Sequence, residues 1–380
     1  MAQPLKKKEV ASFSVADFKK NLLGESNSKV ADKELEWIIM PKAFQDALKL
    51  PGIPQGMGVF SVRGWSDTGK STLKNVAIAA AMRQGILPVI FETEGNFSFQ
   101  FAKDCGMPIE PVYGVNQETG EEGIIDWKGD YFLFTNKGIC DFCGDMDYSL
   151  GKAVSKRRRV PVIEDIAFIM KTFLDKQDNG EIPMPILFCW DSVGSISSFR
   201  SYTSRVGNAQ FDAGAIATAF KDIFPRISSS RQVGSPYTNT FFVVNKIWQD
   251  VMNSMGGAIS IENSGGKTLF YATRLGIHCG GTAKAATKKL KATLKGQEYQ
   301  YGTITKVSVY KNQLPVPFNI TYSGTMCCVH NGIISEDELD NYKKTQIPII
   351  FEKMKQLFGE SALRNAKAED IVFSEEDDTD

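Results

Sequence analysis

The residues with the clearest chemical signature lie between positions 64 and 72, where the chain reads Gly-Trp-Ser-Asp-Thr-Gly-Lys-Ser-Thr. They fit G-x-x-x-x-G-K-[ST], the P-loop or Walker A pattern, in which glycines let successive backbone N–H groups point at phosphate oxygens. The lysine of this pattern reaches the β- and γ-phosphates, and the hydroxyl that follows binds Mg²⁺. We therefore expect ATP and Mg²⁺ as cofactors, bound by Gly64, Ser66, Asp67, Thr68, Gly69, Lys70, Ser71 and Thr72. The alternative is a glycine-rich turn that only precedes a helix.

Two further stretches are apolar and end in carboxylates, as strands do that deliver acidic groups to a nucleotide. Residues 186–191 end in Asp191, which we expect to hold Mg²⁺ through water as a Walker B residue. Residues 89–94 end in Glu-Thr-Glu. Glu94 is the candidate base or water-positioning group because it lies at the strand end, whereas Glu92 lies deeper. The alternative for Asp191 is an aspartate that only caps a turn, and the alternative for Glu92 and Glu94 is a surface pair of carboxylates.

These side chains can form one site only if the strands that carry them end at the same edge of a sheet. Short apolar runs predict strands at 59–62, 89–91, 186–190 and 240–245. After the loop, Leu73, Val76, Ala77 and Ala80 recur at helical spacing. From residue 59 to about 280, strands alternate with helical stretches. This predicts an α/β fold with a mainly parallel twisted sheet and helices on both faces.

The ordered series of motifs resembles the RecA-type recombinases, especially those of large phages related to UvsX, over roughly residues 36–325. Glu94 matches the family's catalytic glutamate, and Asp191-Ser192 matches its Walker B Asp-Ser. Phe101 stands where an aromatic residue stacks on adenine. The remaining matches are the strand into the second DNA-binding loop, the exit from that loop and a late β-segment, at residues 244–247, 264–272 and 306–318.

The resemblance implies a RecA-type P-loop ATPase core and a DNA-dependent ATPase that exchanges DNA strands. Such a protein forms a helical filament on single-stranded DNA, with ATP between adjacent subunits, and pairs that strand with double-stranded DNA. Single-strand-binding and mediator proteins are further partners of this class. The catalytic residues it implies are Glu94, Lys70 and Lys246. Lys246 departs from the family, because an uncharged polar residue usually stands there to sense the γ-phosphate.

Two stretches rich in Gly, Ser and Asn follow predicted strands and suit the holding of a DNA strand. In the first, Arg200 and Arg205 can meet phosphate, and Gly207 gives freedom to the backbone. In the second, apolar side chains can wedge between bases. Its candidate residues are Trp248, Val251, Met252, Met255, Gly256, Gly257, Gly265 and Gly266. The alternative is a pair of ordinary surface loops.

Residues 111–160 interrupt the core pattern with Gly, Asp and Glu clusters, and we expect a surface insertion there. The basic run Lys156–Arg159 is either a solvated face or a DNA contact. Cys140 and Cys143 suggest zinc, but a structural zinc site needs four ligands, and the other Cys pair has the wrong spacing. The insertion's role stays open.

The two ends differ from the core. We expect residues 1–50 to form an oligomerisation segment, in which the helical face of Val15, Phe18 and Leu22 and the strand at 37–40 contact a neighbouring subunit. The core spans 51–330, and 331–380 holds a helical segment and an acidic tail, 374–380, that we expect to be too charged to pack. The tail either competes with DNA or aids solubility. The lysines at 284–295 either hold duplex DNA or form a solvated loop.

Composition limits the classes of function. The 380 residues are 42% hydrophobic with zero formal net charge, so DNA affinity must come from local patches. No apolar run reaches membrane-spanning length, the N-terminus has no signal-peptide pattern, and seven scattered cysteines fit a reducing cytoplasm, that of a bacterial host if the chain is phage-encoded. Two other functions fit the same motifs: a hexameric DNA motor or helicase, and a non-catalytic recombination mediator.

Overall fold

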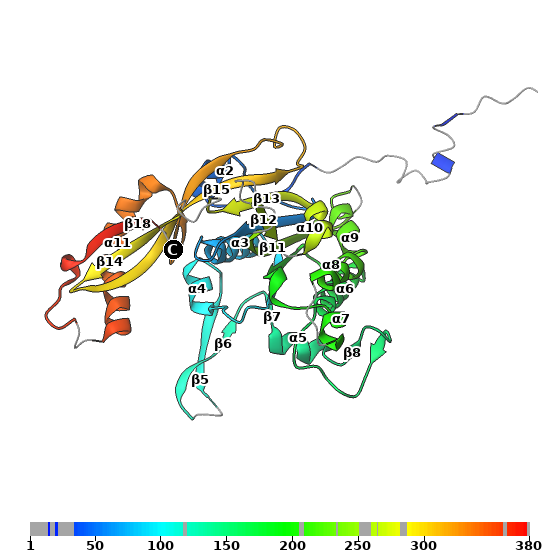
Figure 1. Ribbon diagram of the computed structural model, residues 1–380, viewed down its shortest axis with the longest axis horizontal. Coiled ribbons are helices and arrows are strands. Elements are labelled where there is room, and N and C mark those ends of the chain that lie inside the picture. Colours follow the sequence, from blue (N-terminus) through cyan, green and yellow to red (C-terminus); the bar gives the residue numbers. More distant parts are fainter. Residues whose placement is uncertain are drawn as a thin grey trace, which may run out of the picture.

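The central layer of the fold is a sheet built from the apolar runs of the sequence (Figure 1). The structure is a computed structural model that describes residues 14–15, 20–21, 34–116, 120–204, 209–232, 235–250, 260–263, 265–281, 287–359 and 363–377. Six strands run parallel in the order β7-β4-β10-β11-β3-β13. They are β7 (Phe132–Thr135), β4 (Leu87–Glu92), β10 (Ile186–Asp191), β11 (Thr240–Asp250), β3 (Val59–Gly64) and β13 (Thr273–Cys279). All four strands predicted from apolar runs are confirmed.

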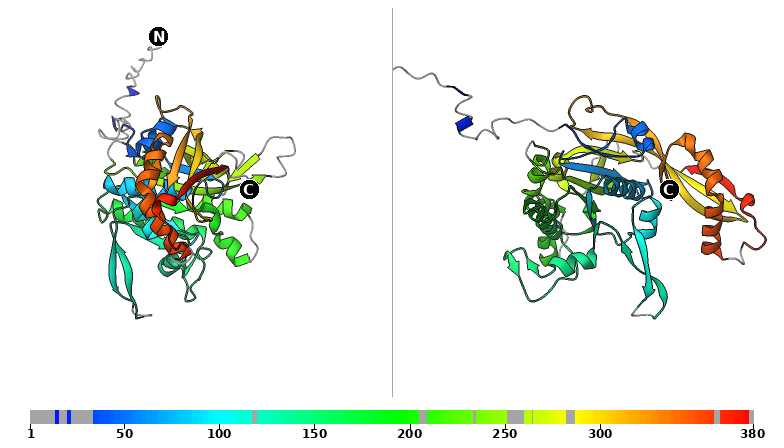
Figure 2. Two further views of the ribbon diagram at one scale, coloured as in Figure 1. Left: turned by 90° about the vertical axis from the view of Figure 1, so that its left-hand side faces the viewer. Right: turned by 180° about the vertical axis from the view of Figure 1, so that it is seen from behind.

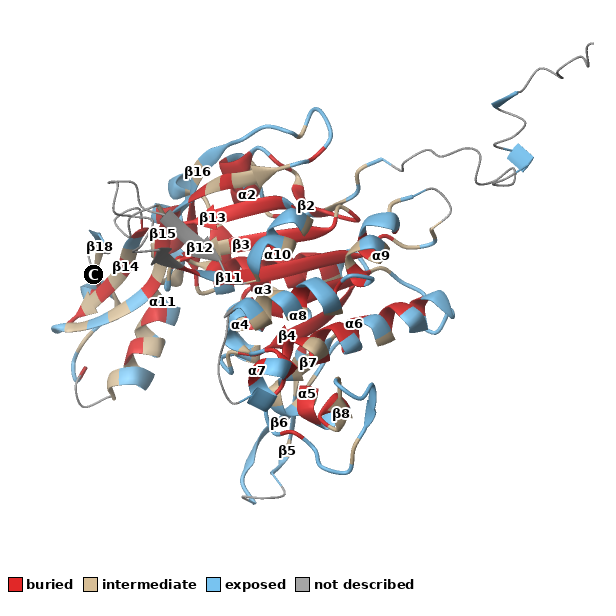
Figure 3. Ribbon diagram, turned by 45° about the vertical axis from the view of Figure 1, so that its right-hand side comes forward, coloured by how far each residue is buried: buried red, intermediate tan, exposed pale blue. Residues whose placement is uncertain are grey.

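Helices cover both faces of these parallel strands, and each face has its own core. Alternate strand residues enter different cores: Ile90 and Val244 pack with α3, whereas Val89 and Val243 pack with α6. Burial on both faces explains why the strands read as continuous apolar runs (Figure 3). The α3 side holds α2 (Lys42–Leu48), α3 (Lys70–Arg83) and α4 (Phe99–Asp104); the α6 side holds α6 (Ile163–Asp178), α8 (Ala209–Ala219), α9 (Ile223–Ser229) and α10 (Gly266–Ala272).

Beyond β13 the sheet continues with antiparallel strands, so the whole sheet is mixed. The sequence had predicted a mainly parallel sheet, and the strands from β7 to β13 are parallel; the antiparallel extension beyond β13 was not predicted. The 16 residues of β15 extend into a small lobe with a third core, around Tyr301, Tyr342 and Met354. This part consists of β14 (Thr287–Leu294), β15 (Gln297–Asn312), β16 (Ser323–Val329), β17 (Gly332–Ile334), α11 (Leu339–Phe358) and β18 (Val372–Asp377).

The acidic C-terminal segment packs, contrary to expectation. Residues 372–377 form β18, which pairs antiparallel with β14 and so covers the basic 287–294 stretch. Lys291 Nζ lies 2.5 Å from a Glu376 carboxylate oxygen and 2.9 Å from one of Glu298. The basic stretch is therefore a strand rather than a loop. Opposite charges across two neighbouring strands stabilise this pairing and offset the repulsion that each segment would have alone.

The 111–160 segment is only partly a surface insertion. It contributes β7, the parallel edge strand next to β4, and α5 (Asn136–Cys143), whose Ile139 and Cys143 are buried in the α6 core. The basic run Lys156–Arg159 is only partly on the surface, because Arg158 is buried and its guanidinium lies 2.7 Å from Asp165 of α6. The parts on the surface are β5 (Glu110–Val115), β6 (Glu122–Lys128), β8 (Met146–Asp147) and β9 (Lys152–Ala153).

Near the N-terminus, β1 (Trp37–Ile39) pairs with β2 (Gly52–Pro54) of its own chain. The sequence had suggested that this strand contacts a neighbouring subunit. Ile38 and Met40 are instead buried in the α3 core of their own chain, so they are not available for such a contact. Of the expected helical face only Val15 is described, and it is exposed; Phe18 and Leu22 lie outside the described residues. The other elements are α7 (Phe199–Ser204), β12 (Ser260–Asn263) and 3₁₀ turns at Val193–Ser195, Glu336–Glu338 and Ala368–Asp370.

Candidate nucleotide site

The loop at 64–72 joins the end of β3 to the start of α3, as its pattern requires. Gly64 has no room for a side chain, because a Cβ there would lie 2.3 Å from the Cys279 carbonyl oxygen. Gly69 caps α3 with a φ of 80°, and a Cβ there would lie 2.4 Å from the sulfur of Cys328. Both glycines therefore allow a tight turn that points the first backbone N–H groups of α3 outward.

A cavity of about 460 Å³ lies over this turn. Its floor is the segment from Asp67 to Thr72, and Phe101 of α4 lines it, where the family resemblance had placed an aromatic residue. The opposite wall comes from β15 and the end of β16, and includes Tyr299 and His330. No sequence motif predicts that wall, because it belongs to the antiparallel extension. A planar group could lie among Phe101, Tyr299 and His330, since all three carry flat rings.

Lys70 lies inside the turn. Its side chain is largely buried, and its ammonium donates to the carbonyl oxygen of Trp65 in the same loop. Burial lowers the pKa of Lys70, although the nearby carboxylates of Asp191 and Glu94 act in the opposite direction. Ser71 is exposed and lines the cavity, whereas Ser66 is exposed at the loop surface outside the cavity lining.

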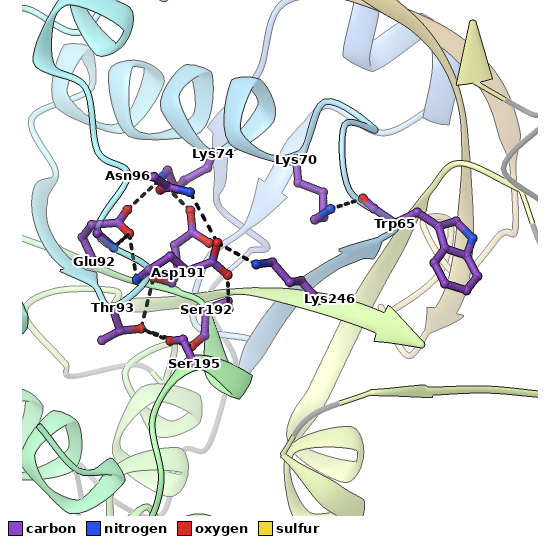
Figure 4. A network of polar contacts seen from close by, with 12 residues as sticks. Trp65, Lys70, Lys74, Glu92, Thr93, Asn96, Asp191, Ser192, Ser195 and Lys246 are labelled. Carbon is purple, nitrogen blue, oxygen red and sulfur yellow. Dashed lines mark hydrogen bonds and ion pairs between the residues drawn. The ribbon is translucent and has the colours of Figure 1, made fainter. Parts of the chain in front are cut away.

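Behind the loop, a buried lysine holds two carboxylates that come from different strands (Figure 4). Lys74 Nζ of α3 lies 2.6 Å from Asp191 Oδ2 and 3.3 Å from Glu92 Oε2. Burial alone would lower the pKa of Lys74, but the two carboxylates outweigh it and raise the pKa to about 12. The sequence pattern gives no sign of this role for Lys74, because a lysine on a helix usually faces water.

Glu92 and Glu94 have different environments, and Glu92 lies deeper, as the sequence had predicted from its position along the strand. Glu92 is buried, and burial raises its pKa. Its Oε1 accepts from the backbone N–H groups of Glu94 and Gly95, at 3.0 and 3.2 Å. Glu92 therefore links Lys74 to the turn that carries Glu94.

Glu94 lies at the open side of this network and contacts two groups. The Ser192 hydroxyl donates to its Oε1, and Lys246 Nζ of β11 lies 3.0 Å from its Oε2. Burial acts to raise the pKa of Glu94, but these two partners outweigh it and the pKa is lowered. Glu94 is thus held as a carboxylate, the form in which it can accept a proton or orient water.

The donors present suit Mg²⁺ better than a tightly caged metal. Within the described ranges, no three His, Cys, Asp or Glu side chains gather as a metal-binding group, and this includes Cys140 and Cys143. Mg²⁺ is usually bound by one or two protein oxygens together with substrate phosphates and water. The Ser71 hydroxyl and the Asp191 carboxylate are oxygens of that kind, so the residues present fit this ion.

The strand that carries Lys246 leads from this site toward the second predicted DNA loop. Lys246 pairs in register with Gly64 of the phosphate-binding turn. Two residues later, Trp248 pairs with Glu262 of β12, so β11 and β12 form the stem of a hairpin. A displacement of Lys246 along this strand would therefore reach the hairpin stem within two residues.

The other predicted DNA residues are placed as follows. Arg200 of α7 is exposed, and its guanidinium lies 4.1 Å from the ring centroid of Phe211. Gly265 and Gly266 start α10 with positive φ angles, and a Cβ on Gly266 would lie 2.7 Å from that of Ala213, which is a structural reason for glycine. Outside the described residues lie Arg205, Gly207, Val251, Met252, Met255, Gly256 and Gly257, and nothing is described of the Trp248 side chain.

Comparison with known proteins gives partial matches. No family model matches the chain. Protein RecA of Roseiflexus castenholzii is 29% identical over 105 residues, which are 27% of this chain and 28% of that protein. Protein RecA of Treponema pallidum is 29% identical over 79 residues, 21% of this chain and 19% of that protein. The matches span less than a third of each relative.

These matches support a RecA-like relationship, and the α/β fold is compatible with a RecA-like core. They favour the recombinase class in general and do not distinguish its phage members. In the part of the chain that the structure describes, no helix is both long and apolar enough to cross a bilayer.

Proposed function

We propose that this chain is an ATP-dependent DNA strand-exchange recombinase of the RecA type, related to the phage UvsX group, that forms helical filaments on single-stranded DNA. The observation that carries the proposal is the Glu94–Lys246 pair, 3.0 Å apart, between the P-loop and the β11–β12 hairpin. A nucleotide site that shares a charged contact with the stem of a DNA loop is what coupling between ATP and DNA requires.

In this proposal each residue has a defined task in ATP hydrolysis. The backbone N–H groups of residues 67–72 and the Lys70 ammonium bind the phosphates, and Ser71 and Asp191 hold Mg²⁺, which neutralises phosphate charge when bound. Glu94 orients the attacking water and accepts its proton. Phe101 stacks on the base from one side of the cavity, opposite the β15 wall that carries Tyr299.

Lys246 takes the place of an uncharged sensor in this scheme. Its ammonium can pair either with Glu94 or with the γ-phosphate, since both are negative and lie at the same edge of the sheet. Exchange between these partners would release Glu94 for catalysis and pull on β11. DNA bound by the hairpin loop would favour one position over the other, and ATP binding and DNA binding would then depend on each other.

The wider assembly belongs to the same proposal. ATP would lie between adjacent subunits of a cytoplasmic filament, with the N-terminal contact within residues 1–50. Single-stranded DNA would be held by the loops around Arg200 and after Trp248, and double-stranded DNA would be the second substrate. Single-strand-binding and mediator proteins are the accessory partners expected for such a filament.

The test combines hydrolysis and microscopy on the full chain. We expect single-stranded DNA to stimulate ATP hydrolysis, and electron micrographs with a non-hydrolysable ATP analogue to show filaments. Lys70→Ala should abolish turnover. Closed rings with directional unwinding would favour a hexameric motor, and DNA binding with no ATP turnover would favour a mediator. Absence of both stimulation and filaments would refute the proposal.

A further inference from the structure

An arm made of β5 and β6 projects from the body of the molecule after α4 (Figures 1 and 2). Its root is firmly packed: the Trp127 ring stacks on Phe99 at 5.5 Å between centroids, and the Tyr131 hydroxyl donates to the Trp127 carbonyl. Beyond the root, side chains on both strands are exposed. A two-stranded hairpin is marginal in water without a packing partner, so this arm suits a contact with something outside its own fold.

One face of the arm is apolar. Tyr113 pairs in register with Ile124, and Val115 lies two residues further along the same face. Their exposed fractions are 72%, 47% and 55%, high for three apolar side chains that lie together. Residues 110–128 contain five acidic residues and one basic residue, so the arm is acidic, and Glu122 pairs in register with Val115 beside the apolar side chains.

A second surface has the opposite charge. We call residues 150–160, which include β9, the basic loop. It has no acidic residue, and its exposed basic side chains are Lys152, Lys156, Arg157 and Arg159. Leu150 and Val160 at its ends are 60% and 53% exposed. Arg158 alone turns inward to Asp165, which fixes the loop to α6. The basic loop thus combines apolar and basic groups, as the arm combines apolar and acidic ones.

The two surfaces lie apart within one copy. The arm and the β8–β9 region occupy separate positions along the same lower side of the molecule in Figure 1, and they are also separate in both views of Figure 2. A contact between two different patches repeats from one copy to the next and builds an open chain of subunits. We propose that the arm of one copy docks on the basic loop of the next copy. This rests on the proposed filament, to which it adds a contact from the 111–160 segment.

The experiment measures self-association of the full chain without DNA, by sedimentation velocity at low and high salt. Glu121→Lys with Glu122→Lys reverses the arm, and Arg157→Glu with Arg159→Glu reverses the basic loop. Each variant should associate about tenfold more weakly than the natural chain, because like charges then face each other. An equimolar mixture of the two variants should associate again. Asp337→Lys with Asp340→Lys, on the small lobe, is the matched control and should change nothing.

A second readout locates the contact directly. Glu122→Cys in one preparation and Arg157→Cys in another should form a mixed disulfide on mild oxidation, whereas all seven natural cysteines are buried. The proposal is overturned if charge reversal leaves association unchanged, or if the basic-loop variant loses only DNA binding. Charge-dependent association without DNA-stimulated ATP hydrolysis would sink the proposed function and leave the arm contact standing. DNA-stimulated ATP hydrolysis without charge-dependent association would refute the arm contact and leave the proposed function standing.

Discussion

The Lys74 ammonium lies 2.6 Å from Asp191 Oδ2 and joins the helix after the phosphate-binding turn to the neighbouring central strand β10. Glu92, 3.3 Å from the same ammonium, extends the link to the turn that carries Glu94. One cation inside the fold therefore positions both the predicted Mg²⁺ ligand and the predicted catalytic group. All three side chains are buried, so the pairing is screened little by solvent.

Lys74→Met should destabilise the fold strongly. It removes the cation and leaves Glu92 and Asp191 buried side by side, and breaking a buried ion pair in this way costs about 3–5 kcal/mol. Urea-induced unfolding followed by tryptophan fluorescence would measure it. Lys291→Met is the matched control, because Lys291 also pairs with two carboxylates but near the surface, and its effect should be much smaller. Equal losses in the two variants would contradict an internal role for Lys74.

The destabilisation in Lys74→Met should also depend on pH. Without the cation, burial raises the pKa of Glu92 still further above its unfolded value. The folded variant then binds a proton that the unfolded chain has released, so stability is lost as pH rises from the unfolded pKa through the folded one. The difference from the natural chain should be smallest in acid and grow toward neutral pH. A stability difference between the variant and the natural chain that shrinks as pH rises would contradict this prediction.

Lys246→Met should move the acid limb of the pH–rate profile. Lys246 helps to lower the pKa of Glu94, so its removal raises that pKa. The carboxylate needed for catalysis then forms only at higher pH, and the acid limb of ATP hydrolysis shifts upward. Stimulation by single-stranded DNA should fall as well. Lys176→Met, in the surface pair Lys176–Glu181, is the control and should leave the profile in place.

Glu94→Gln should separate nucleotide binding from hydrolysis. The amide can still contact Ser192, but it cannot accept a proton, and loss of a positioned base costs about 10²- to 10⁴-fold in rate. Binding of a fluorescent ATP analogue should change by only a few-fold, since Glu94 lies beside the cavity rather than in its lining. Glu181→Gln is the matched control. Turnover that survives in Glu94→Gln would assign the base elsewhere.

The sequence predicted the parallel half of the fold because burial on both faces leaves continuous apolar runs. It missed β7, since Phe132–Thr135 lies among polar segments, and β18, because the charge of the tail conceals its pairing with β14. Lys74 was missed for a related reason: a charge can be buried only where Glu92 and Asp191 approach it, and no single segment contains all three. Phe101 was placed by family resemblance, not by local pattern.

Deletion of residues 372–380 tests what the acidic tail does. It removes β18, so β14 becomes an open edge, and the third core loses Phe373, whose ring lies 5.5 Å from that of Tyr301. The small lobe should become less stable. Lys288 and Lys291 also lose their partners Glu375 and Glu376, so affinity for DNA should rise at low salt and return to the natural value at high salt.

Glu375→Gln with Glu376→Gln separates the two effects of that deletion. The double variant keeps the strand and Phe373 but removes the carboxylates that contact Lys288 and Lys291, so the small lobe should stay nearly as stable as in the natural chain. If the tail competes with DNA for these lysines, this variant should also gain DNA affinity at low salt, in a salt titration of fluorescence anisotropy. If only the deletion changes DNA binding, the tail acts through the structure of the lobe, and electrostatic competition is excluded.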